Sequence, residues 1–368
     1  MEEFPHTVKC HICDQVISKV DAQKDQCFLY LPVASQIKML LEDHGLGKHL
    51  RHRFEDRDPS VIRDVYDGRI YKTLSPLASP DNLSLAFSCD GVPVHKSSKQ
   101  SLWPILCTIN DLPVHLRGKH VMLCGLWFGP NKPHMNSYLK PFVDECNHLY
   151  EHGLEWESES GQTVTSKVLP SFLVADSVAR PVIQNFKQFN GEFGCSYCLH
   201  KGTTVLKRKG RVRAYPYSPV KLRTESQTEE LVEQALSGNP IYGVKGFSIL
   251  SCLPHFNIID GCVPDYMHAV LLGVARRMTS LWFDSENFQS PWYLGPVNDQ
   301  IDSILTSIKP PCNVLRVPRS LRERKYWKAH EWYMWLLFYS VTTLKGLLPE
   351  KYLKHWFKLV KGVFTSTW

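Results

Sequence analysis

Two aspartates, Asp90 and Asp176, each stand directly after a short apolar segment, in a pattern that suits divalent metal binding. Asp90 follows Leu83–Cys89 and precedes Gly91, and Asp176 follows Leu169–Ala175. Mg²⁺ prefers rigidly held oxygen ligands, and a pair of such ions can clamp the attacking and leaving oxygens in phosphoryl transfer. The alternative is that each aspartate only begins a turn, which is the commoner role of aspartate after a strand.

A second candidate site is the CxxC motif formed by Cys195 and Cys198. It has three interpretations: half of a tetrahedral zinc site, a redox dithiol, or two buried thiols. A redox dithiol is expected at a helix N-terminus beside a thioredoxin-like strand, which the pattern does not indicate. Zinc needs two more ligands, and Asp265 and His268 share one face of a predicted helix at i and i+3. The alternative ligands are His200 and His255.

A further zinc candidate lies near the N-terminus, where Cys10 and Cys13 form another CxxC motif with Cys27 and His6 nearby. The arrangement resembles half of a small zinc ribbon, and the alternative is a set of unpaired surface thiols. The chain has 12 cysteines, and its first residues show no signal-peptide pattern. We therefore expect a reducing compartment, where cysteines serve as thiols and metal ligands rather than disulfides.

A basic stretch follows Cys198 and runs into the segment Ala-Tyr-Pro-Tyr. Basic residues with neighbouring tyrosines suit a DNA backbone, because cations displace counterions and rings can stack on bases. The alternative is a solvated loop. The residues expected to contact DNA are Lys201, Lys207, Arg208, Lys209, Arg211 and Arg213.

The elements that must position Asp90 are predicted by the spacing of apolar residues. Leu83–Cys89, Trp103–Ile109 and His120–Phe128 are short apolar runs bounded by turn residues, which predicts three strands. The apolar residues of Asn136–His152 recur at helical spacing, and Gly153 is expected to end that helix.

The strand Leu169–Ala175 and a helix over Ser177–Phe189 complete the order β-β-β-α-β-α. This order predicts an α/β (α+β) fold with a ribonuclease-H-like core, in which the first and fourth strands are neighbours. Asp90 and Asp176 would then lie within reach of one pair of metal ions.

The rest of the chain is expected to support this core. A helix is predicted over Leu31–Glu42, and the basic segment His49–Phe54 is expected to be a solvated loop. Apolar spacing predicts further helices over Tyr266–Trp282, Trp327–Leu347 and Lys351–Lys361. The expected divisions are an N-terminal region 1–82, the core 83–200, a basic loop and linker 201–250, and a helical insertion 251–368.

Composition places limits on the class of protein. Hydrophobic residues make up 43% of the 368 residues and charged residues 21%, which is typical of a folded, soluble protein. The net charge of +7 is compatible with a polyanionic partner but does not require one. No apolar run is long enough for a membrane helix, so no membrane partner is expected.

Several segments of the chain follow one another in a distinctive order and spacing: Ser88–Gly91, Trp103–Leu106, Tyr138–Asp144, Val174–Asp176, Cys195–Cys198, Asp265–His268, Leu321–Trp332 and Leu336–Ser340. Their order resembles that of transposases from CACTA-type (En/Spm-like) DNA transposons, and the resemblance covers about residues 83–365. The chain is more remotely similar to the catalytic subunit of the V(D)J recombinase, where a CxxC motif also follows the second aspartate; here the interval is 195 − 176 = 19 residues.

The resemblance implies a ribonuclease-H-like core interrupted by a helical insertion and a DDE site that cuts and joins DNA strands. Asp90 and Asp176 would be the first two carboxylates, binding Mg²⁺ or Mn²⁺. Cys195, Cys198 and His268 would bind a structural Zn²⁺, with Asp265 as the candidate fourth ligand. The implied partners are transposon-end DNA and a second copy of the chain, and the implied location is the nucleus, with the cytoplasm as the alternative.

The resemblance also implies a third acidic residue, a glutamate in an aromatic-Glu-Asn segment beyond the part that matches. The sequence to Trp368 contains no such segment, so it resembles a transposase truncated at its C-terminus. Glu331 is the nearby carboxylate in a matched motif, and we interpret it as structural, paired with Arg or Lys. We therefore expect impaired DNA cleavage. The alternative is a non-catalytic, zinc-containing DNA- or protein-binding protein derived from a transposase.

Overall fold

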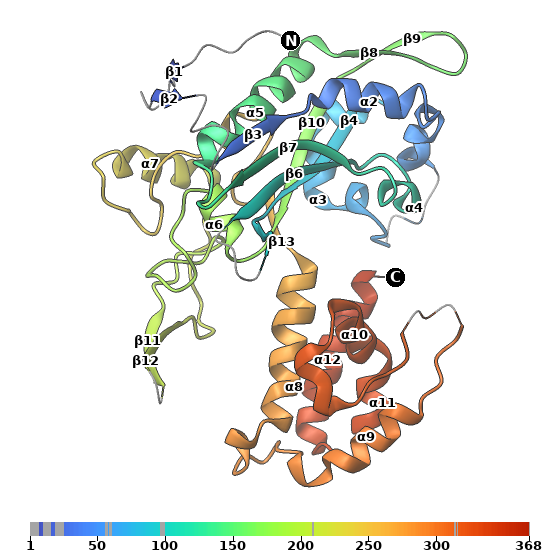
Figure 1. Ribbon diagram of the computed structural model, residues 1–368, viewed down its shortest axis with the longest axis vertical. Helices are drawn as coiled ribbons and strands as arrows, with labels where there is room; N and C mark the ends of the chain where they lie inside the picture. The colour runs from blue at the N-terminus through green and yellow to red at the C-terminus, as the bar shows by residue number, and fades with distance from the viewer. Residues whose placement is uncertain are drawn as a thin grey trace. The chain divides into compact units, whose positions relative to one another are not determined.

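The computed structural model describes residues 7–9, 16–18, 26–55, 58, 61–95, 100–207, 210–312, 314 and 316–367. The chain divides into two compact units, Met1–Pro264 and Asp265–Trp368 (Figure 1). The first unit contains a mixed β-sheet with helices, and the described part of the second is helical.

The sheet of the first unit has the strand order β13-β10-β4-β6-β7-β3, with β5 beside β6. β4, β6, β7 and β3 are antiparallel neighbours, whereas β10 is parallel to β4 and β13 is parallel to β10. The predicted three-strand meander and the pairing of its first strand with the fourth are confirmed. The bounds are β3 (Cys27–Tyr30), β4 (Leu83–Cys89), β5 (Val92–Pro93), β6 (Ser101–Ile109), β7 (Met122–Gly129), β10 (Val168–Ala175) and β13 (Cys262–Pro264).

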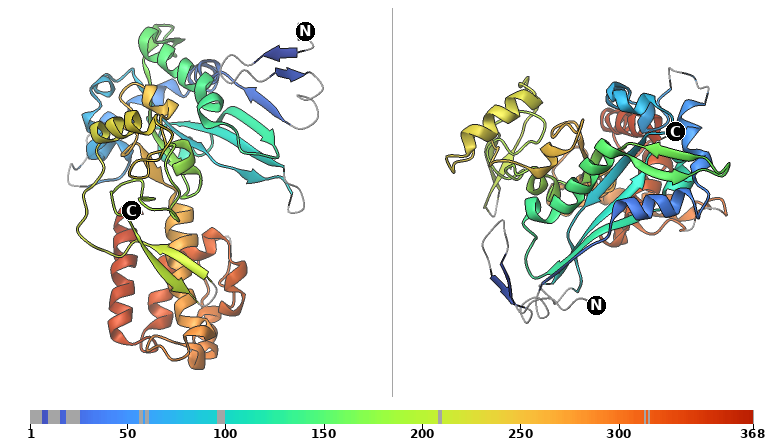
Figure 2. Two further views of the ribbon diagram at one scale, coloured as in Figure 1. Left: turned by 90° about the vertical axis from the view of Figure 1, so that its left-hand side faces the viewer. Right: turned by 90° about the horizontal axis from the view of Figure 1, so that it is seen from above.

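Helix α5 (Met135–His152) runs along one face of this sheet (Figures 1 and 2). Its apolar side is buried in the same core as the strands, and the rings of Phe87 and Phe142 lie 5.1 Å apart. Gly153 ends the helix with φ = 82°, as predicted, because glycine adopts this left-handed conformation without steric cost. Helix α2 (Val33–Leu41) confirms the predicted N-terminal helix and begins where Glu145 accepts the N–H groups of Val33 and Ala34.

Helix α6 (Ala179–Ile183) is much shorter than the predicted Ser177–Phe189. The chain turns at Asn185, whose φ of 58° is left-handed. Beyond it, the N–H of Lys187 donates to the carbonyl of Gly243 instead of continuing a helix. A long-range backbone contact therefore overrides the helical spacing of the apolar residues.

The prediction of a solvated loop at His49–Phe54 is wrong. This segment forms a 3₁₀ helix, η1 (Gly47–Phe54), in which Arg53 is buried and paired with buried Asp111. Asp111 also accepts hydrogen bonds from the Tyr71 hydroxyl (2.7 Å) and the Ser84 N–H (2.6 Å). This network attaches the N-terminal region to the first residues of β4. Its hydrogen bonds also offset the free-energy cost of burying the ion pair.

The remaining described elements of the first unit are short. An antiparallel hairpin of β8 and β9 contains the acidic residues Glu155 and Glu157. A second hairpin, β11–β12, extends away from the sheet (yellow-green in Figures 1 and 2). The bounds are β1 (Thr7–Lys9), β2 (Val16–Ser18), α3 (Arg69–Thr73), α4 (Val114–Arg117), β8 (Leu154–Glu157), β9 (Thr163–Ser166), β11 (Thr203–Lys207), β12 (Gly210–Ala214) and α7 (Glu225–Ala235), with 3₁₀ turns η2 (Val65–Asp67), η3 (Ser75–Ala78) and η4 (Ile249–Cys252).

The second unit packs its helices around buried tryptophans. Trp335 donates to Thr279 (3.0 Å) and Trp356 donates to Ser340 (2.7 Å), so their indole N–H groups are satisfied inside the core. None of the described helices is both long and apolar enough to cross a membrane. The bounds are η5 (Met267–Ala275) and η9 (Trp335–Tyr339), which are π-helical, α8 (Arg276–Phe283), η6 (Ser285–Asn287), η7 (Gly295–Val297), α9 (Asn298–Ser307), η8 (Leu321–Tyr326), α10 (Ala329–Met334), α11 (Ser340–Leu344) and α12 (Glu350–Thr367).

Candidate functional site

Asp90 and Asp176 leave two neighbouring parallel strands at the same edge of the sheet. The register pairs Ser88 of β4 with Val174 of β10, and each aspartate stands two residues further along. Neighbouring strands lie about 5 Å apart, and the two aspartates follow the ends of two such strands. The predicted juxtaposition of the two carboxylate-bearing residues is therefore supported by the strand register.

Hydrogen bonds to the backbone orient both carboxylates, and both residues are half-buried. Asp176 Oδ1 accepts the N–H groups of Val178 (2.8 Å) and Ala179 (2.6 Å), which begins helix α6. Asp90 Oδ1 accepts the N–H of Gly91 (2.7 Å). These contacts are also those of ordinary turns, so they are compatible with both interpretations of the aspartates.

Gly91 allows an aromatic ring to pack beside Asp90. A Cβ atom at Gly91 would lie 2.5 Å from the indole of buried Trp103, a separation that no side chain tolerates. Glycine at position 91 is thus required by the packing of Trp103 from β6.

The CxxC motif forms a compact turn whose sulfur atoms accept backbone hydrogen bonds. Cys195 Sγ accepts the N–H of Tyr197 (3.4 Å), and Cys198 interacts with the backbone of His200 and with the thiol of Cys195. Burial, opposed by the His200 backbone bond, raises the pKa of Cys198. Two adjacent sulfurs that face backbone N–H groups are a donor set that suits a metal–thiolate centre.

A buried arginine lies beside these sulfurs. Arg223 is 5% exposed and donates to the carbonyls of Cys195 (3.0 Å), Phe193 (3.0 Å) and Tyr242 (2.8 Å). Burial lowers the pKa of Arg223, and the nearby thiols of Cys195 and Cys198 oppose that shift. The charge of Arg223 acts to lower the pKa of Cys198, but burial of the thiol outweighs it, so that this pKa is raised overall.

The alternative ligand His200 is already engaged by backbone groups. Its Nδ1 accepts the N–H of Gly202 (2.8 Å), which leaves Nε2 to donate to the carbonyl of Pro216 (3.0 Å). His255 Nε2 is bonded to the hydroxyl of Tyr150 (2.7 Å). Each of these histidines thus has a structural role in the first unit.

Asp265 and His268 interact with each other, as their i, i+3 spacing predicts. Asp265 Oδ2 lies 2.5 Å from His268 Nδ1, and Asp265 Oδ1 accepts the N–H of Met267 (2.8 Å). Both residues belong to the second unit, whereas the CxxC motif belongs to the first. Asp265 directly follows Pro264, the last residue of β13, and so marks the point where the sheet ends and the helical unit begins.

Within the described ranges, no group of three or more His, Cys, Asp or Glu side chains is placed to hold a metal ion. The zinc and magnesium sites therefore stay predictions that rest on the pairs described above. Cys10 and Cys13 lie outside the described residues.

Sequence reasoning missed the role of Tyr197, which lies inside the CxxC motif. Its hydroxyl donates to the carbonyl of Cys262 in β13 (2.6 Å), and the guanidinium carbon of Arg180 lies 5.1 Å from the centre of its ring. Arg180 follows Asp176 by four residues on helix α6. The motif is thus attached to both elements beside the second aspartate. The aromatic residue was visible in the sequence, but its backbone partner was not.

The basic residues after the CxxC motif differ in their environment. Arg213 donates to the Gly202 carbonyl (3.2 Å) and lies 3.6 Å from Glu192, while Lys201 lies 3.9 Å from the same carboxylate. Arg211 is exposed on β12. Lys207 ends β11, and Arg208 and Lys209 lie outside the described residues. Among the described arginines of this stretch, Arg211 is the better placed for an external anion.

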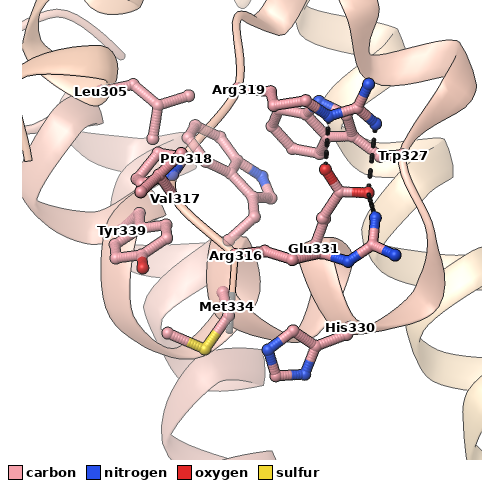
Figure 3. Close-up of a pocket in the computed structure, with 11 residues that line it drawn as sticks. Leu305, Arg316, Val317, Pro318, Arg319, Trp327, His330, Glu331, Met334 and Tyr339 are labelled. Atoms are coloured by element: carbon pink, nitrogen blue, oxygen red, sulfur yellow. Dashed lines mark hydrogen bonds and ion pairs between the residues drawn. The ribbon is translucent and has the colours of Figure 1, made fainter. Parts of the chain in front are cut away.

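Glu331 has the structural role that the sequence analysis assigned to it (Figure 3). Arg319 donates to both of its carboxylate oxygens, at 2.5 and 3.1 Å, and Arg316 lies 3.6 Å away. Glu331 also accepts the N–H of Lys328 (2.7 Å) at the start of α10. These contacts lie along a pocket of the second unit lined by Trp327, Met334 and Tyr339.

Comparison with known proteins gives a match to a protein family. Among curated proteins, no match was found. Residues 61–223 match the family model described as transposase family tnp2, a range that includes Asp90, Asp176 and the CxxC motif. This match supports assigning that part of the chain to a transposase family and suggests that its function derives from a transposase.

Proposed function

We propose that Asp90 and Asp176 are two carboxylates of a DDE-type centre that cuts and joins DNA strands in a CACTA-type transposase. The strand register carries this proposal, because it brings the two aspartates to one edge of the sheet on neighbouring parallel strands. The strand order β7-β6-β4-β10-β13 in the sheet supports a ribonuclease-H-like core. The position of helix α5, after β7 and before β10 along the chain, supports it as well. The family match over the same residues supports a transposase origin.

The residues at this edge fit a hard divalent cation. Carboxylate oxygens are the ligands that Mg²⁺ and Mn²⁺ prefer, and the backbone N–H groups of Gly91, Val178 and Ala179 orient the two carboxylates. A bound metal pair would stabilise the charge that develops on the attacking and leaving oxygens. The protein's own contribution is to hold Asp90 and Asp176 on rigid strand ends.

We also propose that Cys195 and Cys198 supply two ligands of a structural Zn²⁺. The turn geometry of the two sulfurs and the neighbouring charge of Arg223 support zinc at the cysteines. The partner is DNA at transposon ends, which places the working protein in the nucleus, and a second copy of the chain would pair two such ends.

We further propose that cleavage by this chain is impaired. Two-metal centres use several carboxylates, and the described residues offer two at this edge without a third in a metal-binding group. Glu331 is committed to Arg319 and the start of α10. Loss of one ligand from such a centre removes much of its transition-state stabilisation.

Nicking of supercoiled plasmid with Mg²⁺ or Mn²⁺ tests the proposal, together with Mn²⁺ binding followed by electron paramagnetic resonance. We expect weak nicking, and we expect Asp90→Ala and Asp176→Ala to abolish it and to lower Mn²⁺ binding. Asp144→Ala is the matched control, because Asp144 is an exposed carboxylate on α5 paired with Lys140. Mn²⁺ binding that is equal in all three variants would refute the assignment of the aspartates.

A second candidate is a non-catalytic DNA-binding protein derived from a transposase. The exposed basic hairpin β11–β12 favours it, because DNA binding there does not depend on the aspartates. DNA binding without nicking, and without Mn²⁺ binding at Asp90, would support this candidate. Robust nicking that Asp90→Ala abolishes would exclude it and would show that cleavage is not impaired.

A further inference from the structure

The hairpin β11–β12, hereafter the ribbon, is a two-stranded antiparallel element of the first unit. Its register pairs Thr204 with Arg213 and Leu206 with Arg211. It also pairs Val205 with Val212. Because directly opposed residues in an antiparallel pair point to the same face, the register defines two distinct faces.

One face of the ribbon carries arginine beside an exposed leucine. Arg211 and Leu206 are neighbours on this face, and Leu206 is 76% exposed. The opposite face carries Val205 and Val212, which are 44% and 37% exposed. An isolated ribbon gains little stability from such exposed apolar side chains, so they suit contact with a partner.

The charge of the segment indicates the kind of partner. Residues 201–221 contain seven Lys or Arg and no Asp or Glu. Arg213 and Lys201 are near Glu192 at the base of the ribbon, whereas Arg211 lies further along the exposed strand. Positive charge concentrated on a protruding element is complementary to a nucleic-acid backbone.

The base of the ribbon is held firmly by the CxxC segment. Leu199 N–H donates to the carbonyl of Lys221 (2.9 Å), and Arg223 N–H donates to the carbonyl of Tyr197 (2.9 Å). The chain entering the ribbon turns at Gly202, whose φ is 75° and where a Cβ atom would lie 2.6 Å from Arg213. A fixed base lets the exposed strands be presented in a defined direction.

We propose that the ribbon enters a groove of duplex DNA with its Arg211 and Leu206 face toward the DNA. This inference rests on the proposed function and specifies how its DNA substrate is held. The major groove, about 12 Å wide, admits a two-stranded ribbon. Arg211 supplies a cation for a phosphate or a guanine edge, and Leu206 supplies an apolar contact with the base edges.

Binding of a fluorescent DNA duplex to the full-length chain, followed by anisotropy over a range of salt concentrations, tests the proposal. We expect Arg211→Ala to weaken binding about tenfold and to reduce the salt dependence by about one phosphate contact. Leu206→Ser should weaken binding with an unchanged salt dependence. Lys119→Ala is the control, because it removes one exposed positive charge from a turn elsewhere in the first unit. Unchanged thermal midpoints verify that the variants are folded.

Equal affinities of the Arg211→Ala, Leu206→Ser and Lys119→Ala variants would overturn the proposal. Tighter binding to single-stranded DNA or to an RNA duplex of the same sequence would also overturn it. The outcome is separable from that of the proposed function. If the ribbon variants bind normally while Asp90→Ala abolishes nicking, the ribbon proposal fails and the catalytic proposal stands. If the ribbon variants lose affinity while Mn²⁺ binding does not depend on Asp90, the reverse holds.

Discussion

Replacing Glu331 with glutamine separates a structural carboxylate from a catalytic one. Glu331 is buried in the second unit and binds Arg319 through both carboxylate oxygens. The substitution keeps the size of the side chain and one acceptor for the Lys328 N–H, but it removes the charge that faces Arg319 and Arg316. We expect a less stable second unit.

The expected loss can be worked from these contacts. Hydrogen bonds to charged groups contribute about 1.5–3 kcal/mol each, but solvent screens part of this where a partner is exposed. Arg319 and Arg316 are 36% and 54% exposed, so we expect a total loss of about 2 kcal/mol rather than the full sum. For a unit of about 100 residues, this lowers the thermal midpoint by about 8–16 °C.

The effect should depend on pH. Burial by itself would raise the pKa of Glu331, but hydrogen bonds from Arg319 and the Lys328 N–H, with the charges of Arg319 and Arg316, outweigh it and lower the pKa below its usual value of 4.5. A lowered pKa in the folded state stabilises the fold above the unfolded value and loses that effect as pH falls through the folded value. The difference in the free energy of unfolding between wild type and Glu331→Gln should therefore be fully present at neutral pH and should disappear in acid.

Thermal unfolding of the full chain followed by tryptophan fluorescence measures this loss, because seven of the ten tryptophans lie in the second unit. Glu323→Gln is the matched control, since Glu323 also binds Arg319 (3.1 Å) but is 54% exposed, and we expect it to cost less than about 0.5 kcal/mol. A Glu331→Gln variant with an unchanged midpoint and abolished Mn²⁺-dependent nicking would refute the structural role and make Glu331 a candidate catalytic residue.

Two other changes probe the first unit. Asp111→Asn should destabilise it by about 3–5 kcal/mol in chemical unfolding, because it leaves the buried Arg53 without its counter-charge; a loss below about 1 kcal/mol would contradict that reading of the network. Elemental analysis should find about one zinc ion per chain in the wild-type protein. The double variant Cys195→Ser/Cys198→Ser should lose this zinc, whereas the control Cys252→Ser, which changes an exposed cysteine, should keep it. Unchanged zinc content in the double variant would rule out the CxxC site.

The local sequence pattern was sufficient to predict the strands and the helix that position the two aspartates. The strand predicted at Leu83–Cys89 is β4, and the helix predicted at Asn136–His152 is α5 with one more residue. These segments are predictable because their apolar spacing, turn residues and helix-ending glycine agree with the tertiary structure. The neighbouring positions of Asp90 and Asp176 followed from strand order alone.

Long-range contacts decided the features that sequence reasoning missed. The helix after Asp176 stops early because Lys187 bonds to Gly243, and the basic segment around Arg53 is buried because Asp111 lies beside it. Neither partner is close in sequence, so local spacing carries no information about it.

The sequence by itself therefore determined which residue types could do chemistry and the order of the strands that carry them. Only the tertiary structure decided which charges are exposed and which are already satisfied. Glu331 is held by arginines, Arg213 lies near Glu192, and Arg211 is exposed on the ribbon. The physical reason is that a charged side chain looks the same in a sequence whether it faces solvent or a buried partner, and that difference governs what it can bind.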